Sequence, residues 1–130
     1  MAEELTDIDD VKHLMGKEGG AAIIDFWSPT CGPCQAMAPE FDAVAEAYKD
    51  EPIRLVKINT QAQARLAQPF NIRSVPTLLF VLNGEIVDVS VGAMNGHALA
   101  RKADWLLSKA RGDGFFARMF GKKGPRSASD

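Results

Sequence analysis

The architecture of this chain is set by one stretch of sequence, Asp25-Phe26-Trp27-Ser28-Pro29-Thr30-Cys31-Gly32-Pro33-Cys34. The compact apolar run from Ala21 to Trp27 predicts a buried central strand, which Asp25 interrupts. The strand leads through a turn into the first turn of a helix, where Pro33 is tolerated because a first-turn residue has no intrahelical N–H bond to lose. Both cysteines of the chain therefore lie where a strand gives way to a helix.

The spacing of Cys31 and Cys34 predicts a redox pair. Residues three apart on the first turn of a helix share one face, so the two sulfurs can close a small disulfide. Unpaired backbone N–H groups and the positive end of the helix dipole stabilise a thiolate at Cys31, whereas Cys34, one turn deeper, should be the more shielded sulfur. We expect Cys31 to attack a substrate disulfide, Cys34 to resolve the mixed disulfide, and Gly32 to let the substrate backbone approach closely.

Other interpretations of the two cysteines are weaker. A pair of inert buried cysteines does not need Gly-Pro between them. A zinc site needs further ligands, and the only histidines, His13 and His97, lie on predicted helices far along the chain. An iron–sulfur cluster shared across a dimer is a third alternative. We therefore expect no metal and no bound cofactor.

The composition is that of a single globular domain with tails. The chain has 130 residues, 46% of them hydrophobic, and a formal net charge of −2, so nothing global points to nucleic acid or to a membrane. No apolar run near the N-terminus is long enough for a signal peptide, and we expect a cytoplasmic, reducing location. In a reducing compartment, a lone pair of cysteines is more often catalytic or metal-binding than a structural disulfide.

Hydrophobic periodicity and turn signals predict the order helix, strand, helix, strand, helix, strand, strand, helix. The expected elements are a helix from Thr6 or Asp7 to about Lys17, the strand from Ala21 to Trp27, a helix after Cys34 that contains Pro39, a strand from Ile53 to Asn59, a short helix from Gln63 to about Phe70, a hairpin of Thr77 to Leu82 and Glu85 to Val91 over Asn83-Gly84, and a last helix from Asn95 to about Ala110. This order predicts an α/β domain with a mixed sheet of four strands covered by helices on both faces.

Further motifs follow the cysteines in a fixed order. After Asp25-Phe26-Trp27 and Cys31-Gly32-Pro33-Cys34 come Ser74-Val75-Pro76-Thr77 and Val91-Gly92, and the whole set resembles the thioredoxin family over roughly Leu5 to Ala110. The resemblance implies a thioredoxin-like fold, whose usual first edge strand is here absent or very short, which gives four or five strands. It also implies a thiol–disulfide oxidoreductase that reduces disulfide-containing proteins and is re-reduced by a thioredoxin reductase using NADPH. We expect the chain to act as a monomer.

The resemblance also assigns roles to two charged residues of the predicted sheet. Asp25 matches the buried acid beneath the second cysteine, which exchanges a proton with Cys34 during resolution. Lys57 matches the lysine that neighbours this acid. The alternatives are an Asp25 that faces the sheet edge and a Lys57 that is solvated on its strand.

The substrate-binding surface implied by the resemblance consists of six residues: Gly32, Pro33, Val75, Pro76, Gly92 and Ala93. Pro76 matches a cis proline that lies against the dithiol and leaves the backbone of Val75 free to pair with an extended substrate peptide. Gly92 and Ala93 match a rim of small residues on which substrate rests. The alternatives are a trans proline that begins a strand and a glycine that ends a hairpin strand.

The sequence departs from the family pattern at three positions. Thr30 stands where a tryptophan is usual, Gln35 where a lysine or arginine is usual, and Thr60 where an acidic residue is frequent. We expect these changes to act on the choice of partner more than on the chemistry. Two other functions stay open: a binding module in which the dithiol is dispensable, and an oxidase or isomerase on the same fold. The intact Cys-Gly-Pro-Cys argues against both.

The composition changes near the C-terminus, so we expect a domain over residues 1–111 and a basic tail over residues 112–130. Four apolar residues of the tail recur on one helical face: Phe115, Phe116, Met119 and Phe120. We predict that Gly112 and Gly114 form a hinge, and that this apolar face is buried on the domain itself, on another protein or, least favoured, on an anionic membrane. Our hypothesis is that the tail helps to choose partners.

Overall fold

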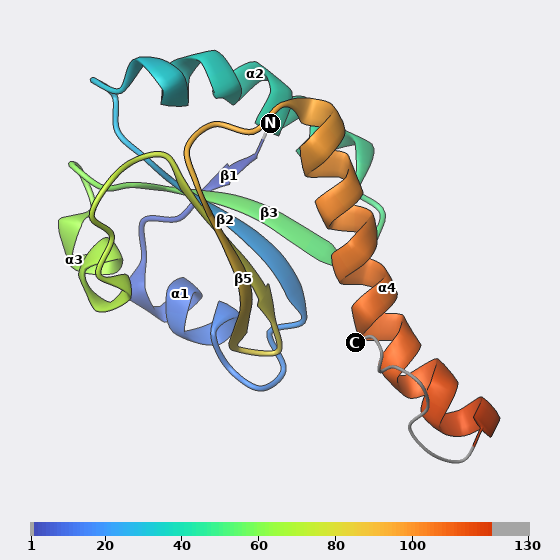
Figure 1. Ribbon diagram of the computed structural model, residues 1–130. Coiled ribbons are helices and arrows are strands. Elements are labelled where there is room, and N and C mark those ends of the chain that lie inside the picture. Colours follow the sequence, from blue (N-terminus) through green and yellow to red (C-terminus); the bar gives the residue numbers. More distant parts are fainter. Residues whose placement is uncertain (1, 121–130) are drawn as a thin grey trace.

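The computed structural model describes residues 2–120, and the side chains of residues 2–112 (Figure 1). The elements in chain order are β1 (Glu3–Glu4), α1 (Ile8–Leu14), β2 (Ala21–Trp27), α2 (Gly32–Ala47), β3 (Ile53–Asn59), α3 (Ala64–Ala67), the 3₁₀ turn η1 (Gln68–Phe70), β4 (Thr77–Leu82), β5 (Glu85–Val91) and α4 (Gly96–Phe120). None of the helices in this part of the chain is both long and apolar enough to span a membrane.

The five strands form one mixed sheet in the order β1-β3-β2-β4-β5, with β2 at its centre. β2 pairs in parallel with β3 and antiparallel with β4, and β4 and β5 form an antiparallel hairpin. β1 has only two residues, and it pairs in parallel with β3. The prediction of an α/β thioredoxin-like sheet with a very short first strand is therefore confirmed.

Helices cover both faces of the sheet, as the sequence predicts (Figure 1). One core lies between the sheet and α2 with α4, and the other lies between the sheet and α1 with α3. Alternate residues of β2 point into the two cores, since successive side chains of a strand face opposite sides. Ile23 and Asp25 therefore lie on the face covered by α2 and α4.

The hairpin turn at Asn83-Gly84 is confirmed, and it is anchored to the start of β2. Both turn residues have positive φ, 51° at Asn83 and 83° at Gly84, as a type I′ turn requires. The N–H of Asn83 donates to the carbonyl of Gly20 at 2.9 Å, and the N–H of Gly20 donates to Oδ1 of Asn83 at 3.1 Å. A Cβ at Gly84 would lie 2.4 Å from the carbonyl oxygen of Met15, so only glycine fits.

Two predicted helices have different boundaries from those expected. α1 begins at the expected cap, because the carboxylate of Asp7 accepts the N–H of Asp9, but it ends at Leu14 rather than near Lys17. Met15 is the C-cap and Gly16 comes next, and glycine has the lowest helix propensity after proline. The helix expected from Gln63 to Phe70 is divided between Ala67 and Gln68 into α3 and η1, because the ring nitrogen of Pro69 has no N–H to continue the α-helical bonds.

The last helix is longer than predicted. α4 begins after Asn95, whose Oδ1 accepts the N–H of Ala98 at 2.8 Å, and it continues beyond Ala110 to Phe120. The expected hinge at Gly112 and Gly114 is wrong, since both glycines lie inside the helix. Each costs only about 1 kcal/mol, and propagation from an established helix gains one hydrogen bond per residue. The apolar tail face and residues 121–130 lie outside the part whose side chains are described, so the tail's contacts stay a prediction.

Candidate active site

Cys31 and Cys34 form a disulfide at the start of α2, with their Cα atoms 5.2 Å apart. Cys31 is the N-cap of the helix, and its extended backbone (φ −95°, ψ 110°) turns the chain from β2 into α2. Cys34 is 2% exposed, whereas Cys31 is only partly buried and the intervening Gly32 and Pro33 are exposed. The expected difference in accessibility between the two sulfurs is therefore present.

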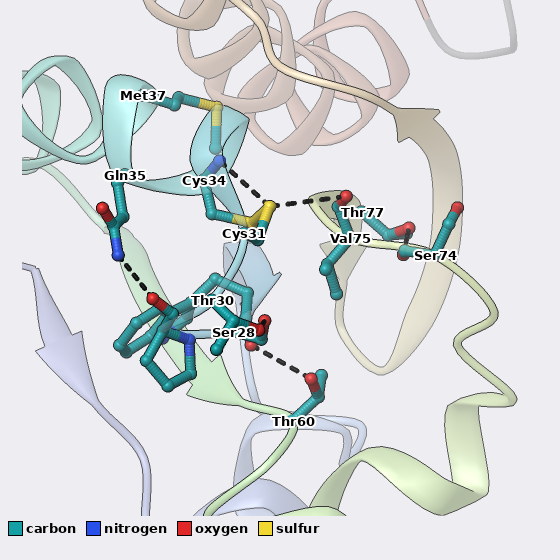
Figure 2. Close-up of a disulfide and its surroundings, with 12 residues drawn as sticks. Ser28, Thr30, Cys31, Cys34, Gln35, Met37, Thr60, Ser74, Val75 and Thr77 are labelled. Atoms are coloured by element: carbon teal, nitrogen blue, oxygen red, sulfur yellow. Dashed lines mark hydrogen bonds between the residues drawn. A yellow bond between two sulfur atoms is a disulfide. The ribbon is translucent and has the colours of Figure 1, made fainter.

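The Sγ atom of Cys31 lies among polar backbone groups (Figure 2). It accepts the N–H of Cys34 at 3.1 Å, which is the hydrogen bond of a helix cap, and it lies 3.6 Å from the carbonyl oxygen of Val75. When the disulfide is reduced, a thiolate at Cys31 would keep the backbone donor and face the positive end of the α2 dipole. This is the environment that favours a nucleophilic sulfur.

Asp25 is a carboxyl group without a partner inside the core. It is 1% exposed, and neither carboxylate oxygen has a hydrogen-bond partner. Its neighbours across the sheet are Lys57 on β3 and Leu78 on β4. Burial raises the pKa of Asp25 from 3.8 to about 7, because desolvation disfavours the carboxylate, and the positive charge of Lys57 opposes this shift. The group can therefore hold or release a proton near neutral pH, but no hydrogen bond joins it to either cysteine.

Lys57 is buried at 9% exposure, which excludes a solvated strand lysine. Its Nζ atom lies 4.9 Å from the centroid of the Trp27 ring, a distance at which the ring quadrupole attracts the ammonium group. The indole N–H of Trp27 donates to Glu4 at 3.4 Å. Trp27, which is only partly buried, therefore packs against Lys57 and contacts β1 through Glu4.

The segment before β4 lies against Cys31. The peptide bond between Val75 and Pro76 is cis, so the alternative of a trans proline is excluded. The N–H of Gly92 donates to the carbonyl oxygen of Pro76 at 2.8 Å, which places the end of β5 beside this segment. Gly92 has φ 102°, which L side chains rarely adopt, and the next residue, Ala93, is exposed. The structure thus brings Val75, Pro76 and Gly92 together, with Cys31 next to Val75.

Polar contacts around Thr30 were missed by the sequence analysis. Nε2 of Gln61 donates to Oγ1 of Thr30 at 3.1 Å, and the hydroxyl groups of Thr30 and Ser28 lie 3.3 Å apart. Gln35 donates through Nε2 to the carbonyl oxygen of Pro29 (Figure 2). The departures at Thr30 and Gln35 therefore serve to hold the loop before Cys31.

A cavity of about 580 Å³ beside Val75 was also missed. Its wall includes Ser28 and Val75 from the dithiol region and two arginines, Arg65 and Arg73. The only signal in the sequence was the presence of two cations shortly before Val75-Pro76. Within the part of the chain that the structure describes, no group of three or more His, Cys, Asp or Glu side chains could hold a metal ion.

Comparisons with known proteins give one consistent result. A family model described as thioredoxin matches residues 6–104. Thioredoxin 1 of Synechococcus elongatus is 42% identical over 82 residues, which cover 63% of this chain and 76% of that protein. The M-type chloroplastic thioredoxin of Spinacia oleracea is 35% identical over 108 residues, covering 82% of this chain and 59% of that protein. The crystal structure of the Malassezia sympodialis thioredoxin matches with a TM-score of 0.68 and 26% identity, over 85% of this chain and 90% of that one.

Proposed function

Since this chain belongs to the thioredoxin family and is a thiol–disulfide oxidoreductase with a disulfide-forming cysteine pair, we propose that it reduces disulfides of other proteins, with Cys31 as the attacking thiol and Cys34 as the resolving thiol. The observation that carries this assignment is the asymmetry of the two sulfurs. Cys31 is partly exposed at the helix start and accepts a backbone N–H, whereas Cys34 is buried.

The reaction proceeds in two exchange steps. The Cys31 thiolate attacks one sulfur of the substrate disulfide, which breaks the substrate S–S bond, forms a mixed disulfide and releases one substrate thiolate. The thiolate of Cys34 then attacks Sγ of Cys31, which forms the Cys31–Cys34 disulfide and releases the second substrate thiol. The substrate gains two electrons, and the protein loses them.

We assign to Asp25 the acceptance of the proton of Cys34 before the second step. A thiol in apolar surroundings is a poor nucleophile until it is deprotonated. The pKa of Asp25, raised to about 7 by burial, suits a proton acceptor near neutral pH. Lys57, which lies across from it on β3, keeps that pKa from rising further. Asp25 is thus the proton acceptor, and the charge of Lys57 adjusts its pKa.

Substrate would bind as an extended peptide along the backbone of the half-buried Val75, between Gly32-Pro33 on one side and Gly92-Ala93 on the other. The support for this is the 3.6 Å approach of Cys31 to the Val75 carbonyl and the hydrogen bond from Gly92 to Pro76. Electrons would return from NADPH through a thioredoxin reductase. A monomeric state and a cytoplasmic location are part of the same proposal, although one matched relative is a chloroplastic protein.

Reduction of insulin disulfides tests the proposal with two electron donors. With dithiothreitol, the protein should accelerate the precipitation of insulin chains, and Cys31→Ser should abolish the acceleration. With NADPH and thioredoxin reductase, the same reaction should consume NADPH. Success with dithiothreitol alone would reject only the reductase partner, whereas failure with both donors would reject the proposed function.

A further inference from the structure

The cavity beside Val75 shares a wall with the dithiol site. Val75, whose carbonyl oxygen faces Cys31, is one of its lining residues, and Ser28, which precedes the dithiol loop, is another. The remaining wall comes from the start of the segment after β3, from α3 and η1, and from the approach to β4. At about 580 Å³ the cavity is large enough for one or two amino-acid side chains.

All charge in the lining of this cavity has one sign. Arg65 on α3 and Arg73 before β4 are its only charged residues, and both are exposed. Among the described side chains, neither forms an ion pair, since the three salt bridges join other residues. The guanidinium groups are therefore available to an anion from solution, and arginine binds carboxylates through two parallel hydrogen bonds.

The rest of the wall offers hydrogen-bonding groups and no competing carboxylate. Thr60 and Gln61 line the side nearest the dithiol loop. Thr60 donates through Oγ1 to the carbonyl of Trp27 at 3.1 Å, and Gln61 donates to Thr30 at 3.1 Å. These contacts fix the wall against the loop that carries Cys31. An anionic side chain in the cavity would meet two cations and neutral polar groups only.

A substrate that pairs with Val75 would pass this cavity. Successive residues of an extended peptide advance by about 3.3 Å, so positions within two residues of the attacked cysteine lie within about 7 Å of it. Since Val75 belongs to both the dithiol site and the cavity wall, such a neighbouring side chain can enter the cavity while the substrate sulfur is at Cys31.

We infer that the cavity bounded by Arg65 and Arg73 is a specificity site for protein substrates that carry an Asp or Glu within two residues of the disulfide cysteine. This inference rests on the proposed function and adds the chemical class of the preferred substrate. The carboxylate of the substrate would pair with the two guanidinium groups while Cys31 attacks the disulfide.

The test uses disulfide-bridged peptides that differ only at one position near a cysteine, which holds Glu, Gln or Lys. Each position within two residues of that cysteine is examined, and the second-order rate constant for reduction by the dithiol form is measured. At the best position Glu should be reduced about fivefold faster than Gln, as expected for two exposed ion pairs, and Lys more slowly than Gln. High salt should diminish the ratio of the rate constants for the Glu and Gln peptides.

Variants locate the effect. With Arg65→Gln and Arg73→Gln, the rate constants for the Glu and Gln peptides should become nearly equal. With Arg65→Lys and Arg73→Lys, most of the preference for the Glu peptide should remain. With Arg65→Glu and Arg73→Glu, the Lys peptide should be reduced faster than the Glu peptide. The matched control is Lys17→Gln with Arg101→Gln, which removes the same net charge from exposed positions outside the cavity and should keep the ratio.

The outcomes separate this inference from the proposed function. If the parent protein reduces the Gln peptide but no position gives a preference for Glu, the specificity site is refuted and the reductase is not. A preference that the control variant loses as fully as the Arg65/Arg73 variant would assign it to overall charge and also refute the site. If no peptide is reduced, the proposed function itself fails.

Discussion

Asp25 and Lys57 occupy paired positions on adjacent parallel strands, yet their side chains share no hydrogen bond and no ion pair. Lys57 instead places its Nζ atom over the ring of Trp27. The carboxyl group is therefore buried without a partner that would fix it as a carboxylate, and the positive charge nearby acts on it only through space. A buried acid left in this state can change its protonation during a reaction.

Asp25→Asn is expected to stabilise the protein at neutral pH. Because the pKa of Asp25 is about 7 in the folded protein and ordinarily 3.8, the folded state holds more protons between these values, and the free energy of unfolding falls as pH rises from about 4 to about 7. The variant should lose this slope and gain about 2 to 4 kcal/mol at pH 8. Urea unfolding from pH 4 to pH 8 measures the free energy of unfolding and its dependence on pH. The same pH dependence in parent and variant would contradict a raised pKa at Asp25.

The same variant should slow resolution of the mixed disulfide by about tenfold to a hundredfold near pH 7, because Cys34 loses its proton acceptor. The measurement is the decay of a preformed mixed disulfide at Cys31, followed by quenched flow. The rate of the first step, attack by Cys31, serves as the internal control. An unchanged decay rate with an unchanged pH profile would remove Asp25 from the mechanism.

Lys57→Gln should raise the pKa of Asp25 above about 7, since the positive charge that lowers this pKa is gone. The midpoint of the pH profile for resolution should move upward by about one unit. If Lys57 had a purely structural role, its substitution would change stability and leave this midpoint in place. The pH profile therefore distinguishes a structural role from an effect on the pKa of Asp25.

Cys34→Ser should accumulate mixed disulfides between Cys31 and substrate proteins, because the partly exposed Cys31 thiol can attack but no second thiol can resolve the product. Cys31→Ser should accumulate none, since the remaining thiol is buried at 2% exposure. Non-reducing gels and mass spectrometry of the adducts give the measurement. Adducts in the Cys31→Ser protein alone would reverse the two roles.

Tyr48 links α2 to α4 through its hydroxyl group, which donates to Asp104 at 2.6 Å and lies 3.2 Å from the carbonyl oxygen of Ala100. The bond to Asp104 raises the pKa of Tyr48 to about 12. Tyr48 is the only tyrosine in the chain, so ultraviolet titration follows it alone. In Asp104→Asn the phenol should ionise closer to pH 10, and Tyr48→Phe should cost about 1 kcal/mol of stability. Circular dichroism at each pH confirms that the protein is still folded.

A chain that ends at Ala110 should still reduce insulin, because every residue assigned to the active site precedes that position. It should also unfold cooperatively, since Leu107 is the last residue of α4 in the core among the side chains that the structure describes. Insulin turbidity and a thermal melt measure the two properties. Absence of a cooperative thermal transition in the shortened chain would show that the C-terminal part of α4 belongs to the domain, contrary to the predicted division at residue 112.

The strands β2, β3, β4 and β5 could be predicted to the residue, whereas β1 and the helix ends could not. β2, β3 and the hairpin have dense apolar runs bounded by glycine, proline or asparagine, and these local signals agree with the tertiary structure. The end of α1 depends on Gly16, and the end of α4 depends on whether two glycines stop a helix that is already formed. Such differences are about 1 kcal/mol, which local sequence does not decide.

The dithiol and its acid could likewise be predicted, because short motifs carry them. The contact between Thr30 and Gln61 could not, since it joins residues 31 positions apart in the sequence. The cavity lined by Arg65 and Arg73 could not be predicted either, because its wall combines α3 with the segment before β4, which only the folded chain brings together. Motifs reveal the reacting groups, and only the fold shows which uncharged and cationic side chains surround them.

The strand order has a consequence for how the protein is made. β2, which positions the cysteines, is completed by β3 and β4, and β4 ends roughly 50 residues after Cys34. A ribosome that adds about 5 to 20 residues per second needs about 2 to 10 s to reach that point. During this interval the nascent chain exposes two thiols with neither the neighbouring Val75 carbonyl nor the buried carboxyl environment of Asp25. The pair on the nascent chain therefore lacks the part of its environment that β3, Val75 and β4 supply until synthesis has passed β4.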